Sequence, residues 1–199
     1  MGASKYISKT IQSEWKGLED KNYNYGSLMQ KREIDFRKEK LSVVKVDKPT
    51  NLVSARSVGY KAKQGIFVAR VRVRKGSGTY HRPKNKRRPK RQGQAKLTRK
   101  KSIRAIAEER ASKKFENAEV LGSYKVAEDG KNHYFEIVLA DRLASTIIND
   151  KELSFLVIGQ QGRAERGKTF AGRVNLDSNK ANKRKKIRKK KLNKNNASK

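Results

Sequence analysis

The sequence predicts an α/β protein of the α+β type, in which a small, mostly antiparallel sheet is packed with helices and carries a long basic loop and an extended basic C-terminal tail. Three observations predict it. Residues 66–74 alternate apolar and basic side chains, as a strand does. Residues 100–117 repeat apolar side chains at helical i, i+3, i+4 spacing. Two apolar runs, 120–127 and 133–140, flank a turn at 128–132 and predict a hairpin.

The 199-residue chain divides into three expected regions. Residues 1–48 form an N-terminal helical extension, with helices expected over 3–18 and 26–40. Residues 49–158 form the α/β core. Residues 159–199 form the extended basic tail.

Within the core, strand 66–74 places Phe67, Ala69, Val71 and Val73 on one face. The opposite face would carry guanidinium groups at a spacing of about 6.6 Å, which is two strand rises. We therefore expect one face to cover a core and the other to meet phosphates. The arginines concerned are Arg70, Arg72 and Arg74.

The remaining core elements follow in order. Residues 75–97 contain three glycines and two prolines with almost no aliphatic side chain, which predicts a long functional loop. The helix over 100–117 buries a stripe, and beyond the hairpin a short helix near 142–149 and an apolar segment at 153–158 complete the core. The stripe consists of Ile103, Ile106, Ala107, Ala111 and Phe115.

The charge is large and segregated. Lys and Arg number 52 against 19 Asp and Glu, a formal net charge of +33. From Lys48 through Ala107 there is no acidic residue, and none follows from Ser178 to Lys199. A solvated surface would intersperse the two signs. This layout indicates sustained contact with a polyanion.

Composition excludes several classes of function. There is no cysteine, which removes disulfide scaffolds, zinc ribbons and thiol nucleophiles together. No apolar run approaches the ~20 residues of a membrane span, and the N-terminus has no apolar signal segment. A soluble, cytoplasmic protein without a membrane partner is therefore expected.

Residues 162–169, with the sequence Gly-Arg-Ala-Glu-Arg-Gly-Lys-Thr, fit the phosphate-binding loop pattern of nucleotidases. Such a loop must open a helix that returns to a parallel sheet. After Arg173 about 26 polar residues follow with no strand to receive it. A flexible basic turn against nucleic acid is the favoured interpretation.

Catalytic and metal chemistry have little support. His81 and His133 have no metal-ligand spacing, so His81 is expected to contact nucleic acid or solvent and His133 to be an ordinary strand-edge residue. Glu108 and Glu109 point about 100° apart on a helix and are expected to pair with neighbouring Lys or Arg. No enzymatic activity, cofactor, metal or small-molecule substrate is expected.

The residues expected to contact RNA combine basic side chains with aromatic rings that could stack on unpaired bases. For Tyr60, core packing is an equal alternative. The full set is Arg56, Tyr60, Lys61, Lys63, Arg70, Arg72, Arg74, Lys75, Tyr80, His81, Arg82, Lys84, Lys86, Arg87, Arg88, Lys90, Arg91, Arg163, Arg166, Lys168, Arg173, Lys183, Arg184, Lys185 and Arg188.

Several ordered blocks resemble the archaeal and eukaryotic ribosomal protein family 15e of the large subunit. They include Gly59-Tyr60-Lys61-Ala62-Lys63-Gln64-Gly65 with the strand after it, Ala107-Glu108-Glu109-Arg110-Ala111, and Ala171-Gly172-Arg173. The resemblance spans roughly residues 1–175, and the short chain is similar to archaeal members. After Arg173 the family is Gly- and Arg-rich, whereas Lys and Asn dominate here.

The resemblance implies a non-catalytic structural protein of the cytoplasmic ribosome. Its partners would be large-subunit ribosomal RNA, bound by phosphate neutralisation, and neighbouring ribosomal proteins. Two alternatives stay open at this point. A DNA-compacting chromatin protein would share the charge and the tails, and a nucleotidase would use residues 162–169.

Overall fold

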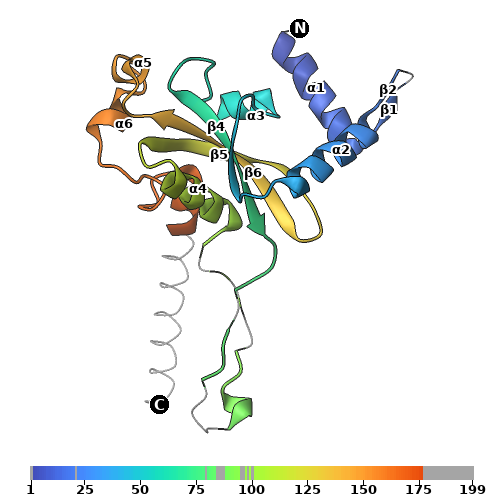
Figure 1. Ribbon diagram of the computed structural model, residues 1–199, viewed down its shortest axis with the longest axis vertical. Helices are drawn as coiled ribbons and strands as arrows, with labels where there is room; N and C mark the ends of the chain where they lie inside the picture. Colours follow the sequence, from blue (N-terminus) through green and yellow to red (C-terminus); the bar gives the residue numbers. More distant parts are fainter. Residues whose placement is uncertain are drawn as a thin grey trace, which may run out of the picture.

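The centre of the fold is a four-stranded antiparallel sheet in the order β3-β4-β6-β5 (Figure 1). A computed structural model describes residues 2–20, 22–78, 80–83, 88–94, 97, 99 and 101–176. The predicted α+β class, with a small antiparallel sheet packed by helices, is confirmed. The strands are β3 (Val43–Val46), β4 (Ile66–Arg74), β5 (Ala118–Glu128) and β6 (Asn132–Asp141).

The predicted N-terminal helices are present and slightly shorter than expected. Helix α1 covers Ala3–Lys16 and ends at Gly17, whose φ of 62° is left-handed and suits glycine. A two-stranded ladder, β1 (Glu19–Asp20) with β2 (Tyr23–Asn24), leads into α2 (Tyr25–Lys38). The Asn24 side chain caps α2 by accepting a hydrogen bond from the Ser27 N–H at 2.9 Å.

The remaining helices are short except for α4. Helix α4 (Ile103–Lys114) lies inside the predicted 100–117 range and begins at the Ser102 cap. The others are α3 (Leu52–Ser57), the 3-10 turn η1 (Pro89–Arg91), α5 (Ser145–Ile148) and α6 (Ser154–Ile158). Residues 170–176 are also helical. Neither β3 nor α3 was predicted from the sequence.

Both faces of the sheet are buried. On one face Ala69, Val71 and Val73 of β4 pack with Ile137 of β6 and Ala107 of α4. On the other face a second cluster joins α2 to the sheet and to α5 and α6. That second cluster includes Phe36, Ile66, Val68, Tyr134, Val138, Ile147 and Leu156.

The expectation that the second face of β4 is open is therefore wrong. Ile66 and Val68 lie on the same face as Arg70 and are 8% and 1% exposed. The alternation showed only that arginines share this face. It could not show that α2, through Phe36, and the segment around Thr50 come back to cover it.

The hairpin turn between β5 and β6 is organised by Asp129. Its carboxylate accepts hydrogen bonds from the Lys131 N–H at 2.6 Å and from the Tyr134 hydroxyl at 2.8 Å. The Asn132 N–H donates a third at 2.5 Å. Burial disfavours the charged form, but these bonds outweigh it and hold the pKa of Asp129 at about 2. His133, expected at a strand edge, instead lies in the central strand β6 beside this turn.

Replacing this residue, Asp129→Ala, should lower the free energy of unfolding at pH 7 by about 1–2 kcal/mol. The native pKa is depressed, so the contribution is complete above the unfolded value near 3.9 and is lost as pH falls through about 2. Urea unfolding at pH 7 and pH 2 measures it. If the difference in stability between the wild type and Asp129→Ala were the same at pH 7 and pH 2, the carboxylate charge would not be its cause.

Candidate nucleic-acid interface

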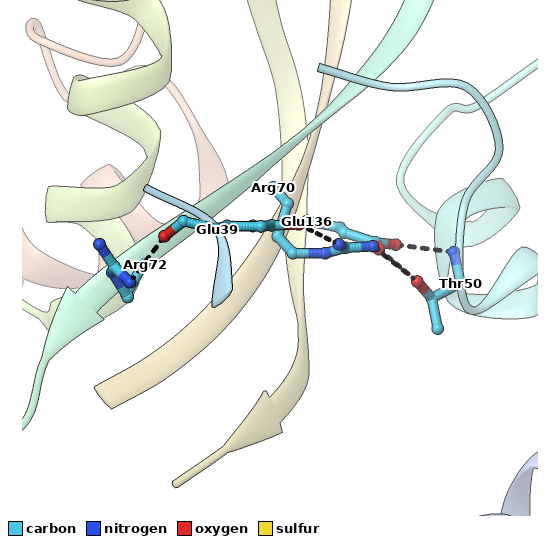
Figure 2. A network of polar contacts seen from close by, with 5 residues as sticks. All are labelled: Glu39, Thr50, Arg70, Arg72 and Glu136. Atoms are coloured by element: carbon cyan, nitrogen blue, oxygen red, sulfur yellow. Dashed lines mark hydrogen bonds and ion pairs between the residues drawn. The ribbon is translucent and has the colours of Figure 1, made fainter. Parts of the chain in front are cut away.

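The three arginines of β4 have different environments. The Arg70 side chain is 12% exposed and ion-paired with Glu39 at 2.7 Å and Glu136 at 3.3 Å (Figure 2). Its guanidinium also lies 3.8 Å from the centroid of the Phe36 ring. Arg70 is therefore a core cation whose charge is balanced within the protein.

Glu136 collects the hydrogen bonds of this network. It is fully buried and accepts from the Thr50 N–H at 2.9 Å and from the Tyr124 hydroxyl at 2.6 Å. Burial and the adjacent Glu136 charge raise the pKa of the Tyr124 hydroxyl far above its usual value, so Tyr124 stays a donor. The network thus ties β4, β5, β6 and the β3–α3 segment together.

Arg72 and Arg74 complete the series. The Arg72 guanidinium donates to the backbone oxygens of Glu39 at 3.1 Å and Lys40 at 3.4 Å, as Figure 2 shows for Glu39. Arg74 is exposed at the end of the strand, and its side chain has no hydrogen bond or ion pair with any residue in the described ranges. The predicted row of free guanidinium groups is thus wrong for Arg70 and Arg72, because both are already bound internally.

Some of the predicted RNA-binding residues that precede β4 also have partners within the protein. Arg56 is exposed on α3, whereas Tyr60 is half-buried against the core, in keeping with its alternative interpretation. Lys61 pairs with Glu152 at 2.6 Å on the surface, and Lys63 pairs with Asp150. Exposed pairs of this kind contribute little energy, so Lys61 can exchange its carboxylate for a phosphate at small cost.

The predicted basic loop extends from the end of β4 away from the sheet (Figure 1). Its two arms come together where the Gly78 N–H donates to the Leu97 carbonyl at 3.2 Å. Lys75, at its base, pairs with Glu128 at 3.5 Å. Tyr80, His81, Arg82, Arg88, Lys90 and Arg91 are all exposed. Lys84, Lys86 and Arg87 lie outside the described residues.

Residues 162–169 do not form a nucleotide site. The Gly162 and Arg163 N–H groups donate to the two oxygens of the Glu119 carboxylate at 2.7 and 3.1 Å. The Thr169 hydroxyl donates to Glu108 at 2.5 Å. The groups that would hold a phosphate therefore already hold carboxylates of the core.

Sequence reasoning missed these two buried acids. Glu119 and Glu108 are each 1% exposed. Glu108 was expected to pair with a neighbouring base. That pair is present, with Arg104 at 3.9 Å, and Glu109 pairs with Lys101 at 2.5 Å, but the closer partners of Glu108 are the hydroxyls of Ser123 and Thr169. No local pattern signals this, because the partners lie 15 and 61 residues away.

Residues 159–176 differ from the expected extended tail. Ala164, Thr169 and Ala171 are at most 5% exposed, so this segment packs onto the core. The Arg163 guanidinium is half-buried and donates to the Val120 carbonyl at 3.0 Å, and that of Arg166 donates to the Gln161 carbonyl at 3.1 Å. Lys168 and Arg173 are exposed. Lys183, Arg184, Lys185 and Arg188 fall outside the described residues.

Replacing the buried acid, Glu119→Ala, should lower the free energy of unfolding by about 2–4 kcal/mol, since it leaves the partly buried N–H groups of Gly162 and Arg163 without their acceptor. Chemical denaturation measures it. The matched variant Glu116→Ala removes an exposed acid nearby and should cost less than ~0.5 kcal/mol. Equal losses in the two variants would contradict the assignment.

Among the described residues, no group of three or more His, Cys, Asp or Glu is placed to hold a metal ion. No helix in the described part of the chain has the length and apolar character to cross a membrane.

Comparison with known proteins identifies the family. A family model described as Ribosomal L15 matches residues 3–196. The large ribosomal subunit protein eL15 of Methanocella arvoryzae is 48% identical over 164 residues, covering 82% of each chain. That of Picrophilus torridus is 47% identical over 165 residues (81% of this chain, 82% of the relative), and that of Haloarcula marismortui 45% over 166 residues (83% of each). Matches of this length and identity show that the chain belongs to the ribosomal L15 family, as its ordered sequence blocks had indicated.

Proposed function

We propose that this structural constituent of the large ribosomal subunit binds large-subunit ribosomal RNA by neutralising backbone phosphates with its exposed loop cations and C-terminal tail. The α+β core serves as a rigid anchor. Members of the family are structural proteins, so the expectation of a non-enzymatic protein of the cytoplasmic ribosome is confirmed. Neighbouring ribosomal proteins are the proposed protein partners.

The contrast between paired and free cations carries the proposal. In the core, Arg70 and Lys63 have carboxylate partners, and Arg72 has backbone acceptors. In the loop, Arg82, Arg88, Lys90 and Arg91 are exposed, and no acid lies anywhere from Lys48 to Ala107. An external polyanion would relieve their mutual repulsion.

The DNA-compacting alternative is not supported. The relatives are named as large ribosomal subunit proteins. A loop projecting from a folded core also suits the irregular surfaces of folded RNA, where phosphates approach from several directions.

Sedimentation of a lysate on sucrose gradients across a salt series tests the proposal. The chain should co-migrate with the large subunit at a stoichiometric level and be released only at high salt, since each phosphate contact adds about 0.7–0.9 to the log–log salt slope. Recovery at the top of the gradient, or with DNA, would overturn it.

A further inference from the structure

We propose that a groove between α6 and residues 159–173 holds one unpaired RNA nucleotide, with its base stacked on Phe155 and its phosphates on Arg166, Lys168 and Arg173. This proposal rests on the proposed function and adds a selective site to its general phosphate contacts. The groove is open and has a volume of about 420 Å³. Its lining is Phe155, Leu156, Gly159, Gln160, Arg163, Arg166, Lys168 and Arg173.

Phe155 is an exposed ring on a fixed element. Its neighbours Leu153 and Leu156 are 8% and 2% exposed and anchor α6 in the core, whereas Phe155 is 51% exposed. The Arg163 guanidinium lies 5.2 Å from the centroid of the ring. Arg163 is itself held by the Val120 carbonyl, so the ring and the cation are positioned before any ligand arrives.

The positive charge of the groove comes from Arg166, Lys168 and Arg173. Arg166 is oriented by the Gln160 and Gln161 carbonyls. The Lys168 and Arg173 side chains have no hydrogen bond or ion pair with a residue in the described ranges and are exposed. Burial, together with the nearby charges of Arg173 and Arg166, lowers the pKa of Arg163 against the opposing effect of Glu119. The charges of Arg163, Arg166 and Arg173 thus repel one another around the groove, and no carboxylate of the described residues lies within ion-pair distance of them.

An exposed aromatic ring beside a cluster of cations selects an unpaired nucleotide over a duplex. A duplex hides its base faces by stacking, whereas an extruded or single-stranded base offers a face to an aromatic ring. The phosphates on the ribose of that nucleotide would then reach Arg166, Lys168 and Arg173. Phe170, which is 64% exposed near Arg104, has the same ring chemistry but lies outside the groove lining and provides the matched control.

Photo-crosslinking of the full chain to a hexanucleotide RNA containing 4-thiouridine tests the site. Adducts mapped by mass spectrometry should occur on the other residues that line the groove, within 156–173, and separately on residues 80–94 of the loop. The Phe155→Leu variant should lower the groove adduct at least fivefold, the range expected for loss of one stacked base, and leave the loop adducts unchanged. The Phe170→Leu variant should leave both unchanged.

Charge and ligand source are tested in the same assay. The double variant Lys168→Gln, Arg173→Gln should lower the groove adduct at least fivefold without changing the thermal unfolding of the chain. A free mononucleotide offers the same chemistry, so the source is distinguished by adding UMP at the RNA's nucleotide concentration before irradiation, which should leave adduct formation unchanged if the groove takes its nucleotide from an RNA chain. Loss of the adduct in the presence of UMP would overturn the assignment to RNA, and equal effects of the Phe155 and Phe170 variants would overturn the groove itself. Continued co-sedimentation with the large subunit would show that the proposed function itself still holds.

Discussion

Replacing Arg70 by methionine should destabilise the protein by about 3–5 kcal/mol, because the fully buried Glu136 and the partly buried Glu39 would lose their shared cation. Methionine preserves much of the contact with Phe36 and the rest of the second core, so lost packing contributes little. Urea unfolding monitored by circular dichroism measures the change.

The control lies on the same strand. Arg74→Met removes an exposed arginine four residues further along β4 and should change stability by no more than ~0.5 kcal/mol. For the salt dependence of RNA binding, the larger effect should come from Arg74→Met. Arg74→Met should reduce the salt slope of RNA binding by about 0.7–0.9, whereas Arg70→Met should leave it unchanged after correction for unfolded protein. A reduced slope in well-folded Arg70→Met protein would restore Arg70 as a phosphate ligand.

A double-mutant cycle separates the ion pair from the other contacts of the network. The double variant Arg70→Met, Glu136→Leu should lose less stability than the two single variants lose in sum. Each single variant leaves one charge buried without its partner, whereas the double variant removes both charges. Additive losses would mean that Arg70 and Glu136 do not interact in solution.

Removing the tip of the loop should abolish most of the RNA affinity and leave the fold intact. The Gly78 N–H and the Leu97 carbonyl are hydrogen-bonded, so two glycines can replace residues 79–96 as a hairpin turn. The deletion removes eight Lys and Arg residues. The log–log salt slope should fall by about 5–7, and incorporation into large subunits should drop by orders of magnitude.

A second variant distinguishes charge from reach. It keeps the full length of the loop and replaces those eight basic residues by glutamine. If phosphate neutralisation is the mechanism, this variant should bind as weakly as the deletion. If it incorporated as well as the wild-type chain, the loop would act by shape, and the neutralisation mechanism would be wrong. Thermal unfolding of both variants should match that of the wild type, since no described residue of the tip belongs to either core cluster.

The sequence predicted the elements that depend on local periodicity. Alternation placed β4 at residues 66–74, the residues the structure shows, and the helical spacing located α4. Strand β3 and helix α3 were missed although local signals exist. Three valines lie within Val43–Val46, and Asn51 caps α3 through the Ser54 N–H at 2.9 Å. Such short elements carry too few residues for a period to stand out.

The features of the candidate interface also divide into those that the sequence determines and those that depend on the fold. The sequence by itself determined the net charge, the acid-free interval from Lys48 to Ala107 and the family, because these are properties of residue order. Only the tertiary structure decided which cations remain free. Arg70 meets Glu136 across 66 residues, and Gly162 meets Glu119 across 43. A buried ion pair forms where the fold brings two charges that are distant in sequence together at low dielectric. The periodicity of the sequence therefore cannot predict it.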